Sequence, residues 1–248
     1  ILGTATKTDN TNVPWVNILG NGGVVIKAVA SAADMNSWIT TNSDRVLFGI
    51  STANNTGTFS TSAANVDSTN DKLSCAMIRQ MKIMARTTEG GTTGITPYMT
   101  EDGREYFVMF AGIRAFRDLK TDSEMVAANR DARAREGDGM KNNPLFQDGD
   151  LMIDGVIVRE EPYITRLLTT ASTFLSAAGA ASIPVEPVFL CGAAAGGIAW
   201  GQKPTPRAQK FDYDFRMGAA VEELRGLEKL NYNGLQNGMV TGFVSGVA

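Results

Sequence analysis

The fold is decided between residues 106 and 158, where the chain reads YFVMF (106–110), IRAFRDLK (113–120) and LMIDGVIV (151–158). The run Tyr106 to Phe110 is continuously apolar and of strand length, which is typical of a strand covered on both faces. The stretch Ile113 to Lys120 then predicts a short helix. Leu151 to Val158 places two apolar arms around the turn dipeptide Asp154-Gly155, which predicts a β-hairpin. Together these elements predict a mixed α/β protein.

An amphipathic helix is predicted before this segment. Its apolar stripe has spacings of four, four and three residues and consists of Leu73, Met77, Met81 and Met84. Core packing explains this stripe better than a promiscuous methionine-rich binding groove does. The polar residues that suit the start of the helix, because they accept hydrogen bonds from free backbone N–H groups, are Ser68, Thr69 and Asn70. Gly90-Gly91 supplies the left-handed freedom that ends a helix.

Other stretches carry weaker patterns. The run Ser51 to Ser68 is almost wholly small and polar, and it predicts either a disordered surface loop or an extended arm that lies on a neighbouring subunit. Ser123 to Glu136 reads as a charged helix with a solvated face. Val188 to Leu190 and Met239 to Val244 read as strands. Met217 to Leu230 shows the apolar spacing of a helix.

Composition excludes several classes of function. The 248-residue chain has 20% charged residues and a net charge of −3, which argues against a dedicated nucleic-acid binder with a strongly basic face. It contains no histidine, so the commonest general base, the commonest metal ligand and every Ser-His or Cys-His arrangement are missing. No apolar run reaches the roughly 18–20 residues of a membrane-spanning helix. The chain begins with Ile1 rather than Met, which indicates processing or a start inside a longer gene product.

No constellation of residues predicts a catalytic, cofactor-binding or metal site. Cys75 and Cys191 have no C-x-x-C spacing, so we expect free buried thiols, with a single disulfide between them as the alternative. The run Gly192 to Gly197 lacks the Gly-Lys-Ser/Thr ending of a phosphate-binding loop, which favours close backbone packing. The acidic residues that come nearest to a calcium loop or a carboxylate pair are Asp148, Asp150, Asp154, Asp212 and Asp214. The first three lack the glycine of an EF-hand loop, and the last two lack a third ligand.

Short motifs follow one another in a fixed order along the chain. They are Arg117-Asp118-Leu119-Lys120, Asn143-Pro144-Leu145-Phe146, Gly155-Val156-Ile157-Val158, Leu190-Cys191-Gly192-Ala193, Phe211-Asp212-Tyr213-Asp214 and Leu224 to Leu230. In this order and spacing, the chain resembles the major capsid proteins of tailed bacteriophages, of the podovirus type that carries a large virion RNA polymerase. The resemblance covers roughly the last 180 of the 248 residues.

The resemblance implies the Hong Kong-phage-type major capsid fold, an α+β architecture with an N-terminal arm, an extended hairpin loop, a peripheral domain with a spine helix and an axial domain. Residues 1–67 would then form the arm and a shortened extended loop, and residues 68–113 the peripheral domain with the spine helix. Residues 114–185 would form the axial domain, and residues 186–248 the strands that return from it. The family pattern has strand-like segments at Met217 to Leu230, so we expect tertiary context to override the helical spacing there.

The resemblance also implies the function of a self-assembling shell protein without enzymatic activity. Its partners would be copies of itself in pentamers and hexamers, scaffolding or decoration proteins, and packaged double-stranded DNA, with no membrane, in a virion assembled in the cytoplasm of a bacterial host. Leu145 and Phe146 are predicted to anchor subunit packing, and Arg79, Lys82 and Arg86 to face the DNA. Two alternatives stay open: a tail-tube or decoration protein, and a hydrolase that uses Asp212 or Asp214.

Overall fold

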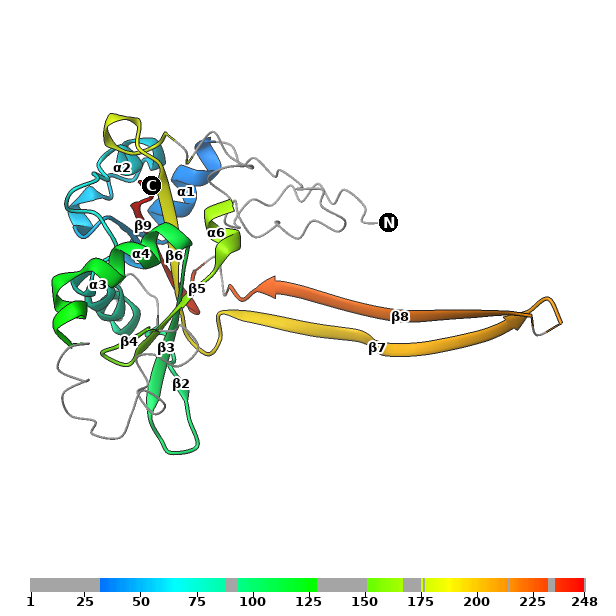
Figure 1. Ribbon diagram of the computed structural model, residues 1–248. Coiled ribbons are helices and arrows are strands. Elements are labelled where there is room, and N and C mark those ends of the chain that lie inside the picture. Colours follow the sequence, from blue (N-terminus) through cyan, green and yellow to red (C-terminus); the bar gives the residue numbers. More distant parts are fainter. Residues whose placement is uncertain are drawn as a thin grey trace.

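The computed structural model describes residues 32–87, 93–128, 151–166, 175, 177–213, 215–231 and 235–247. Within these residues, seven strands form one mixed sheet in the order β1-β9-β6-β3-β5-β4, with β2 paired to β3. Strands β7 and β8 form a separate two-stranded hairpin, which projects far from the body of the molecule (Figure 1). The predicted α+β class is confirmed.

The strands of the body are β1 (Val46–Phe48), β2 (Tyr98–Met99), β3 (Glu105–Ala111), β4 (Leu151–Ile153), β5 (Val156–Glu160), β6 (Val185–Cys191) and β9 (Met239–Ser245). The helices are α1 (Ala32–Thr41), α2 (Phe59–Ala64), α3 (Cys75–Arg86), α4 (Ile113–Thr121) and α6 (Pro162–Arg166), with short 3₁₀ turns at Ser43–Arg45, Thr52–Asn54 and Ala180–Ser182. The predicted strand at Tyr106 to Phe110, the helix after it and the hairpin around Asp154-Gly155 are confirmed as β3, α4 and β4–β5.

Two hydrophobic clusters cover the two faces of the seven-stranded sheet. Successive residues of a strand point to opposite faces, and in β9 Val244 belongs to one cluster and Phe243 to the other. The first cluster joins the sheet to α3 and α4, and the second joins it to α1 and α2. Strand β9 is therefore buried on both faces, whereas β3 is fully buried on one face and only half-buried on the other.

Helix α3 packs its methionine stripe against β9 and β6. Met77 and Met81 are fully buried, which confirms that the stripe belongs to the core. The helix comes this close because residue 242 is a glycine: a Cβ at Gly242 would lie 2.9 Å from Met77 Cε and 3.0 Å from Met81 Sδ. A larger residue at this position of β9 would force the ends of the two methionine side chains to move.

Arg45 is fully buried and ties the start of β1 to the end of α3. Its guanidinium donates hydrogen bonds to the carbonyl oxygens of Met84, of Thr87 (3.2 Å) and of Thr93 (2.9 Å). The last carbonyls of a helix have no partner inside it, and a cation there complements the helix dipole. Burial lowers the pKa of Arg45, so these hydrogen bonds offset a substantial cost of desolvation.

Glu186 of β6 serves the start of α4 in a comparable way. Its buried carboxylate accepts hydrogen bonds from the backbone N–H of Ala115 (2.8 Å) and from Thr165 Oγ1 (2.5 Å). A negative charge is favourable at the N-terminus of a helix, although burial raises the pKa of Glu186. Gly112 is required next to it, because a Cβ there would collide with the Glu186 carboxylate.

The predicted start of the spine helix was wrong. Helix α3 begins at Cys75, and Ser74 caps it by accepting a hydrogen bond from the Met77 N–H at 3.4 Å. Thr69 and Asn70 lie instead in a turn, where their N–H groups donate to Asp67 Oδ1 at 2.7 and 2.6 Å. The carboxylate of Asp67 competes for these donors and starts a turn before the helix can form. Gly90-Gly91 lies outside the described residues.

The predicted arm or structureless loop at Ser51 to Ser68 was also wrong. This stretch contains the turn Thr52–Asn54 and helix α2, and it packs on the body of its own chain. Phe59, Ala63 and Val66 are buried, and the Phe59 ring lies edge-on to Phe243 at 5.3 Å. These three apolar residues decide the outcome, because their burial outweighs the polar composition around them.

A long hairpin lies between β6 and β9. Within the described part of residues 1–67 there is no hairpin, whereas β7 (Gly196–Phe211) and β8 (Arg216–Lys229) form one in the segment predicted to contain return strands. The expectation that Met217 to Leu230 adopts strand structure despite its helical spacing is confirmed by β8. Strands from all four predicted segments meet in one sheet or in this hairpin, so the division into domains stays a prediction.

Replacing Arg45 with leucine is expected to lower the free energy of unfolding by roughly 2–4 kcal/mol, because the carbonyl oxygens of Met84, Thr87 and Thr93 lose their donor. Chemical denaturation followed by circular dichroism measures the change. The matched control is Arg104→Leu, the same substitution at an exposed turn, which should stay within about 0.5 kcal/mol of the wild type. Equal effects of the two substitutions on the free energy of unfolding would contradict the role of Arg45 as the donor to these carbonyl oxygens.

Candidate assembly surface

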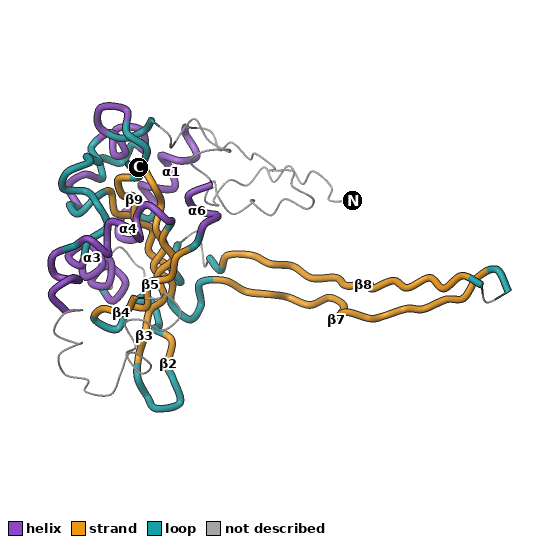
Figure 2. Tube along the Cα trace, in the orientation of Figure 1, coloured by secondary structure: helices purple, strands orange, loops and turns teal. Residues whose placement is uncertain are grey.

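The hairpin of β7 and β8 dominates the exposed surface of the described chain. Its strands pair antiparallel from Gly196↔Lys229 at the root to Phe211↔Arg216 near the tip. Figures 1 and 2 show that no other described element lies alongside its outer half. A two-stranded ribbon in water is marginally stable at best. The hairpin therefore needs a further surface to pack against, and its own chain does not supply one among the described residues.

The hairpin also carries most of the large exposed apolar side chains of the described chain. Those on the strands are Ile198, Trp200, Phe211, Met217, Val221, Leu224 and Leu227. Met217 and Val221 are 73% and 70% exposed. Isolated apolar residues on a surface are ordinary, but a contiguous exposed patch marks a site of interaction with another molecule. The apolar residues between Met217 and Leu227, whose spacing resembles that of a helix, thus lie on an exposed strand.

The tip of the hairpin is a tight turn with exposed aromatic residues. Asp212 and Tyr213 have φ angles of 56° and 52°, and the Phe215 N–H donates to the Asp212 carbonyl at 3.0 Å. Tyr213 and Phe215 are 96% and 87% exposed. Asp212 is therefore a turn residue at the far end of an extended hairpin, which does not favour a hydrolase that depends on a converging acidic cleft. Asp214 lies outside the described residues.

The root of the hairpin is closely packed. Gly192 N–H donates to the Gly238 carbonyl at 2.9 Å, and Ala193 N–H donates to the Thr96 carbonyl at 2.9 Å. A Cβ at Gly192 or at Gly238 would collide with the neighbouring backbone. The prediction that the run Gly192 to Gly197 serves close backbone packing is therefore confirmed at its first glycine.

A half-buried lysine closes the root. Lys229 Nζ donates a hydrogen bond to Gln236 Oε1, and the Gln236 N–H donates to Asn42 Oδ1 at 3.0 Å. This chain of hydrogen bonds connects the end of β8 to the residue that follows α1. Desolvation lowers the pKa of Lys229 to about 7, and Cys191 on β6 opposes that shift. Cys191 and Cys75 are both free thiols, as predicted, and burial raises the pKa of each.

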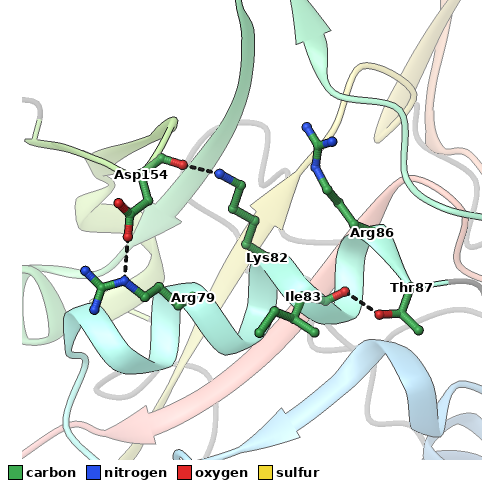
Figure 3. A pocket seen from close by; sticks show the side chains of 6 residues that line it. All are labelled: Arg79, Lys82, Ile83, Arg86, Thr87 and Asp154. Carbon is green, nitrogen blue, oxygen red and sulfur yellow. Dashed lines mark hydrogen bonds and ion pairs between the residues drawn. The ribbon is translucent and has the colours of Figure 1, made fainter.

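A second candidate surface is an open groove of about 620 Å³ along the exposed side of α3 (Figure 3). Its lining brings together the predicted DNA-facing residues Arg79, Lys82 and Arg86. Arg79 pairs with Asp154 and with Glu124, and Arg86 pairs with Glu105. Lys82 Nζ donates to the backbone carbonyl of Asp154. The hydrogen bond from Arg79 holds the pKa of Glu124 below its ordinary value.

The groove is therefore a network in which carboxylates compensate the two arginines. Asp154 accepts from Arg79 and sits in the turn between β4 and β5, so the network fixes this hairpin to α3. Its role as a DNA-facing surface stays a prediction. Leu145 and Phe146, predicted as packing anchors, lie outside the described residues, as do Asp148 and Asp150. Among the described residues, no group of three or more His, Cys, Asp or Glu side chains is placed to hold a metal ion.

None of the helices in the described ranges is both long enough and apolar enough to cross a membrane.

Comparison with known proteins gives consistent results. A family model described as phage capsid protein matches residues 17–243. The major capsid protein of Pseudomonas phage KPP25 is 28% identical over 161 residues, which make up 64% of this chain and 40% of that protein. The capsid subunit of cyanophage Pam1 is 37% identical with a TM-score of 0.75, over 93% of this chain and 62% of that one.

A more distant likeness concerns the fold alone. The capsid of Ralstonia phage GP4 contains a chain that is 19% identical, with a TM-score of 0.59 over 92% of this chain and 60% of that chain. These likenesses confirm the predicted resemblance to phage capsid proteins at the level of the mixed fold. The chain spans less than two thirds of the length of each of these three relatives.

Replacing Lys229 with methionine is expected to raise the free energy of unfolding most at low pH. The folded-state pKa of about 7 lies below the ordinary value of 10.5. Between these values the unfolded chain binds a proton that the folded chain has lost, so the stability of the wild type rises with pH across this window. The advantage of the Lys229→Met variant should therefore shrink from pH 7 toward pH 10.5. Denaturation curves at several pH values measure it.

The control for this prediction is Lys72→Met, which removes an exposed lysine just before α3. Its free energy of unfolding should stay within about 0.5 kcal/mol of the wild type. A constant difference between wild type and Lys229→Met across the whole window would contradict the burial of an uncharged amine at the root.

Proposed function

The chain belongs to the phage capsid protein family, whose model matches residues 17–243, and from this premise we propose that it forms the shell of a phage head as a major capsid protein. Membership of this family confirms the prediction that the chain is a structural component of the virion and not an enzyme. Within the molecule, the projecting β7–β8 hairpin with its exposed apolar side chains is the observation that best supports the proposal.

The hairpin supports assembly for a physical reason. Burying one Val, Leu or Met side chain contributes about 1.5–3 kcal/mol, and several such side chains are exposed on one ribbon. Contacts in which one subunit projects onto the next are head-to-tail contacts, which close into rings when the rotation between subunits permits. Rings of copies in pentamers and hexamers then combine many individually weak contacts into a stable shell.

The finer architecture belongs to the same proposal. In it, the fold is the Hong Kong-phage type, α3 is the spine helix, and residues 68–113, 114–185 and 186–248 correspond to the peripheral domain, the axial domain and the return segment. The relatives would be podoviruses that carry a virion RNA polymerase. Assembly would take place in the cytoplasm of the host bacterium, with scaffolding or decoration proteins as further partners. Leu145 and Phe146 would contribute subunit contacts near the axial domain.

The shell proposal predicts that hairpin removal abolishes assembly but not folding. In the test variant, the segment Ile198 to Leu227 is replaced by a two-residue Asn-Gly turn, so that both ends of the root remain. The wild-type chain should form shells seen by electron microscopy, and the truncated chain should sediment as a monomer with an unchanged melting temperature. A wild-type chain that stays monomeric at high concentration, or that forms tubes, would contradict the proposal.

We further propose that Lys82 contacts packaged double-stranded DNA, together with Arg79 and Arg86. The support is their common position on the exposed side of α3 and the fact that the hydrogen bond from Lys82 goes to a backbone carbonyl rather than to a carboxylate. An ammonium group in this position keeps its full charge available for a phosphate. Arg79 and Arg86 share their charge with Glu124, Asp154 and Glu105, so their contribution would be smaller.

The DNA proposal predicts that Lys82→Glu lowers the DNA content of assembled heads. A single substitution is preferable, because changing Arg79 or Arg86 as well would break the ion pairs that hold α3 to its neighbours. The readout is the ratio of DNA to protein in purified heads, with Lys120→Glu on α4 as the control. Unchanged DNA content in well-formed heads would refute the placement of α3 toward the DNA.

A further inference from the structure

The two faces of the β7–β8 hairpin differ in chemistry. Cross-strand partners lie on the same face, and alternate residues of one strand share a face. The register shifts between Trp200 and Gln202 and between Gln202 and Thr205 each place one extra residue on β7, so β8 keeps an unbroken alternation. One face, here called the Met217 face, carries the odd-numbered residues of β8 and their partners. The other, the Arg216 face, carries the even-numbered residues and theirs.

The Arg216 face carries two large apolar side chains, Phe211 and Leu224, which are 50% and 64% exposed. A Cβ at Gly218 would lie 2.9 Å from the Phe211 ring, and a Cβ at Gly201 would lie 2.9 Å from Leu224 Cδ2. Each of these side chains therefore lies across a glycine of the opposite strand. The remainder of this face includes the ion pair of Arg207 with Glu222, whose Nε and Oε2 atoms are 3.0 Å apart.

The Met217 face carries more apolar side chains than the Arg216 face does. Its apolar members are Ile198, Pro206, Ala208, Met217, Ala219, Val221 and Leu227. Near its middle, Arg225 lies over the Trp200 ring at 6.0 Å and pairs with Glu223 at 3.1 Å. The charge there is internally balanced. Lys210 near the tip and the half-buried Lys229 at the root also belong to this face. These two cations lie at opposite ends of it, and the mostly apolar side chains between them suit another protein surface better than DNA, which requires a denser row of cations.

The size of the face limits the strength of one contact. Strand β8 has 14 residues, which at about 3.3 Å per residue gives a length near 46 Å, and a ribbon with its side chains is about 10 Å wide. The face thus offers roughly 460 Å² to a partner, whereas a stable pairwise interface buries about 800 Å² on each partner. A single docked hairpin is therefore a weak contact, which becomes effective when every copy both supplies a hairpin and receives one.

From these observations we propose that the Met217 face docks on a second copy of this chain, while the Arg216 face stays in contact with solvent. This inference rests on the proposed shell function, because copies of the chain are then the partner present at high local concentration. It adds two points to that function. It states which face of the hairpin is buried, and it states that docking is weak between two subunits and strong only in a closed assembly. Assembly should therefore begin sharply at a threshold concentration of protein.

The test compares two neighbouring residues of β8 that point to opposite faces. Val221→Glu places a carboxylate on the Met217 face opposite Pro206, and Ala220→Glu places the same group on the Arg216 face opposite Arg207. A buried carboxylate without a partner is strongly unfavourable, so Val221→Glu should raise the threshold concentration at least about tenfold. Ala220→Glu should leave it within about twofold of the wild type. Light scattering against protein concentration measures the threshold.

A second measurement reports the face directly. In the full chain, Val221→Cys should react with a maleimide in the monomer and become protected in particles assembled from the purified chain alone. Ala220→Cys should react equally in both states. The native thiols serve as an internal reference, because Cys75 is buried and Cys191 is half-buried.

Each outcome of these experiments has a distinct meaning. If the wild-type chain does not assemble at all, the shell function itself fails. If the wild type and both glutamate variants assemble at one threshold, or if Ala220→Glu is the more harmful, the shell function stands and the face assignment is overturned. If protection of the Val221→Cys thiol requires added DNA or another virion protein, the second copy is not the occupant of the Met217 face.

Discussion

The packing of helix α3 on strand β9 is the contact on which the rest of the structure depends. Two buried methionines fit against Gly242, and this fixes the helix on the central antiparallel pair β6 and β9. That pair leads directly into the hairpin, because β6 is followed by β7 and β8 is followed by β9. The exposed ribbon is thus an extension of the most deeply buried strands of the body.

The buried side chains of Arg45 and Glu186 and the half-buried Lys229 refine this arrangement. Two of them satisfy helix ends that would otherwise carry unpaired backbone groups, and the third holds the root of the hairpin. Each is costly to bury and is retained with hydrogen-bond partners. They share a consequence for geometry: α3 and α4 are each held at one end by a side chain from a different element, and the hairpin is held at its root by its own Lys229. A hairpin fixed at its root can present one face consistently to a neighbour.

Local patterns in the sequence predicted much of the body. Continuous apolar runs at β3 and β6, the Asp154-Gly155 turn and the methionine stripe of α3 each depend on short-range chemistry, and each was found. The failures involve competition with distant residues. Asp67 takes the donors of the predicted helix caps, and Phe243 draws Phe59 into the core out of a polar run. The candidate assembly surface was harder to predict, because the spacing of Met217, Val221 and Leu224 fits a helix as well as a strand. The alternation of Met217, Ala219 and Val221 was the signal that indicated a strand.

The hairpin also explains why a protein of this kind tolerates exposed apolar surface. A ribbon that bound one partner tightly would capture neighbours at random and trap misassembled shells, since strong contacts do not dissociate in time to correct errors. A narrow ribbon face with charges in its middle gives weak, directional contacts instead. The ion pair of Arg207 with Glu222 on the opposite face discourages stacking of the wrong side. The small area of the ribbon face makes each single contact weak, and the same small area makes assembly accurate.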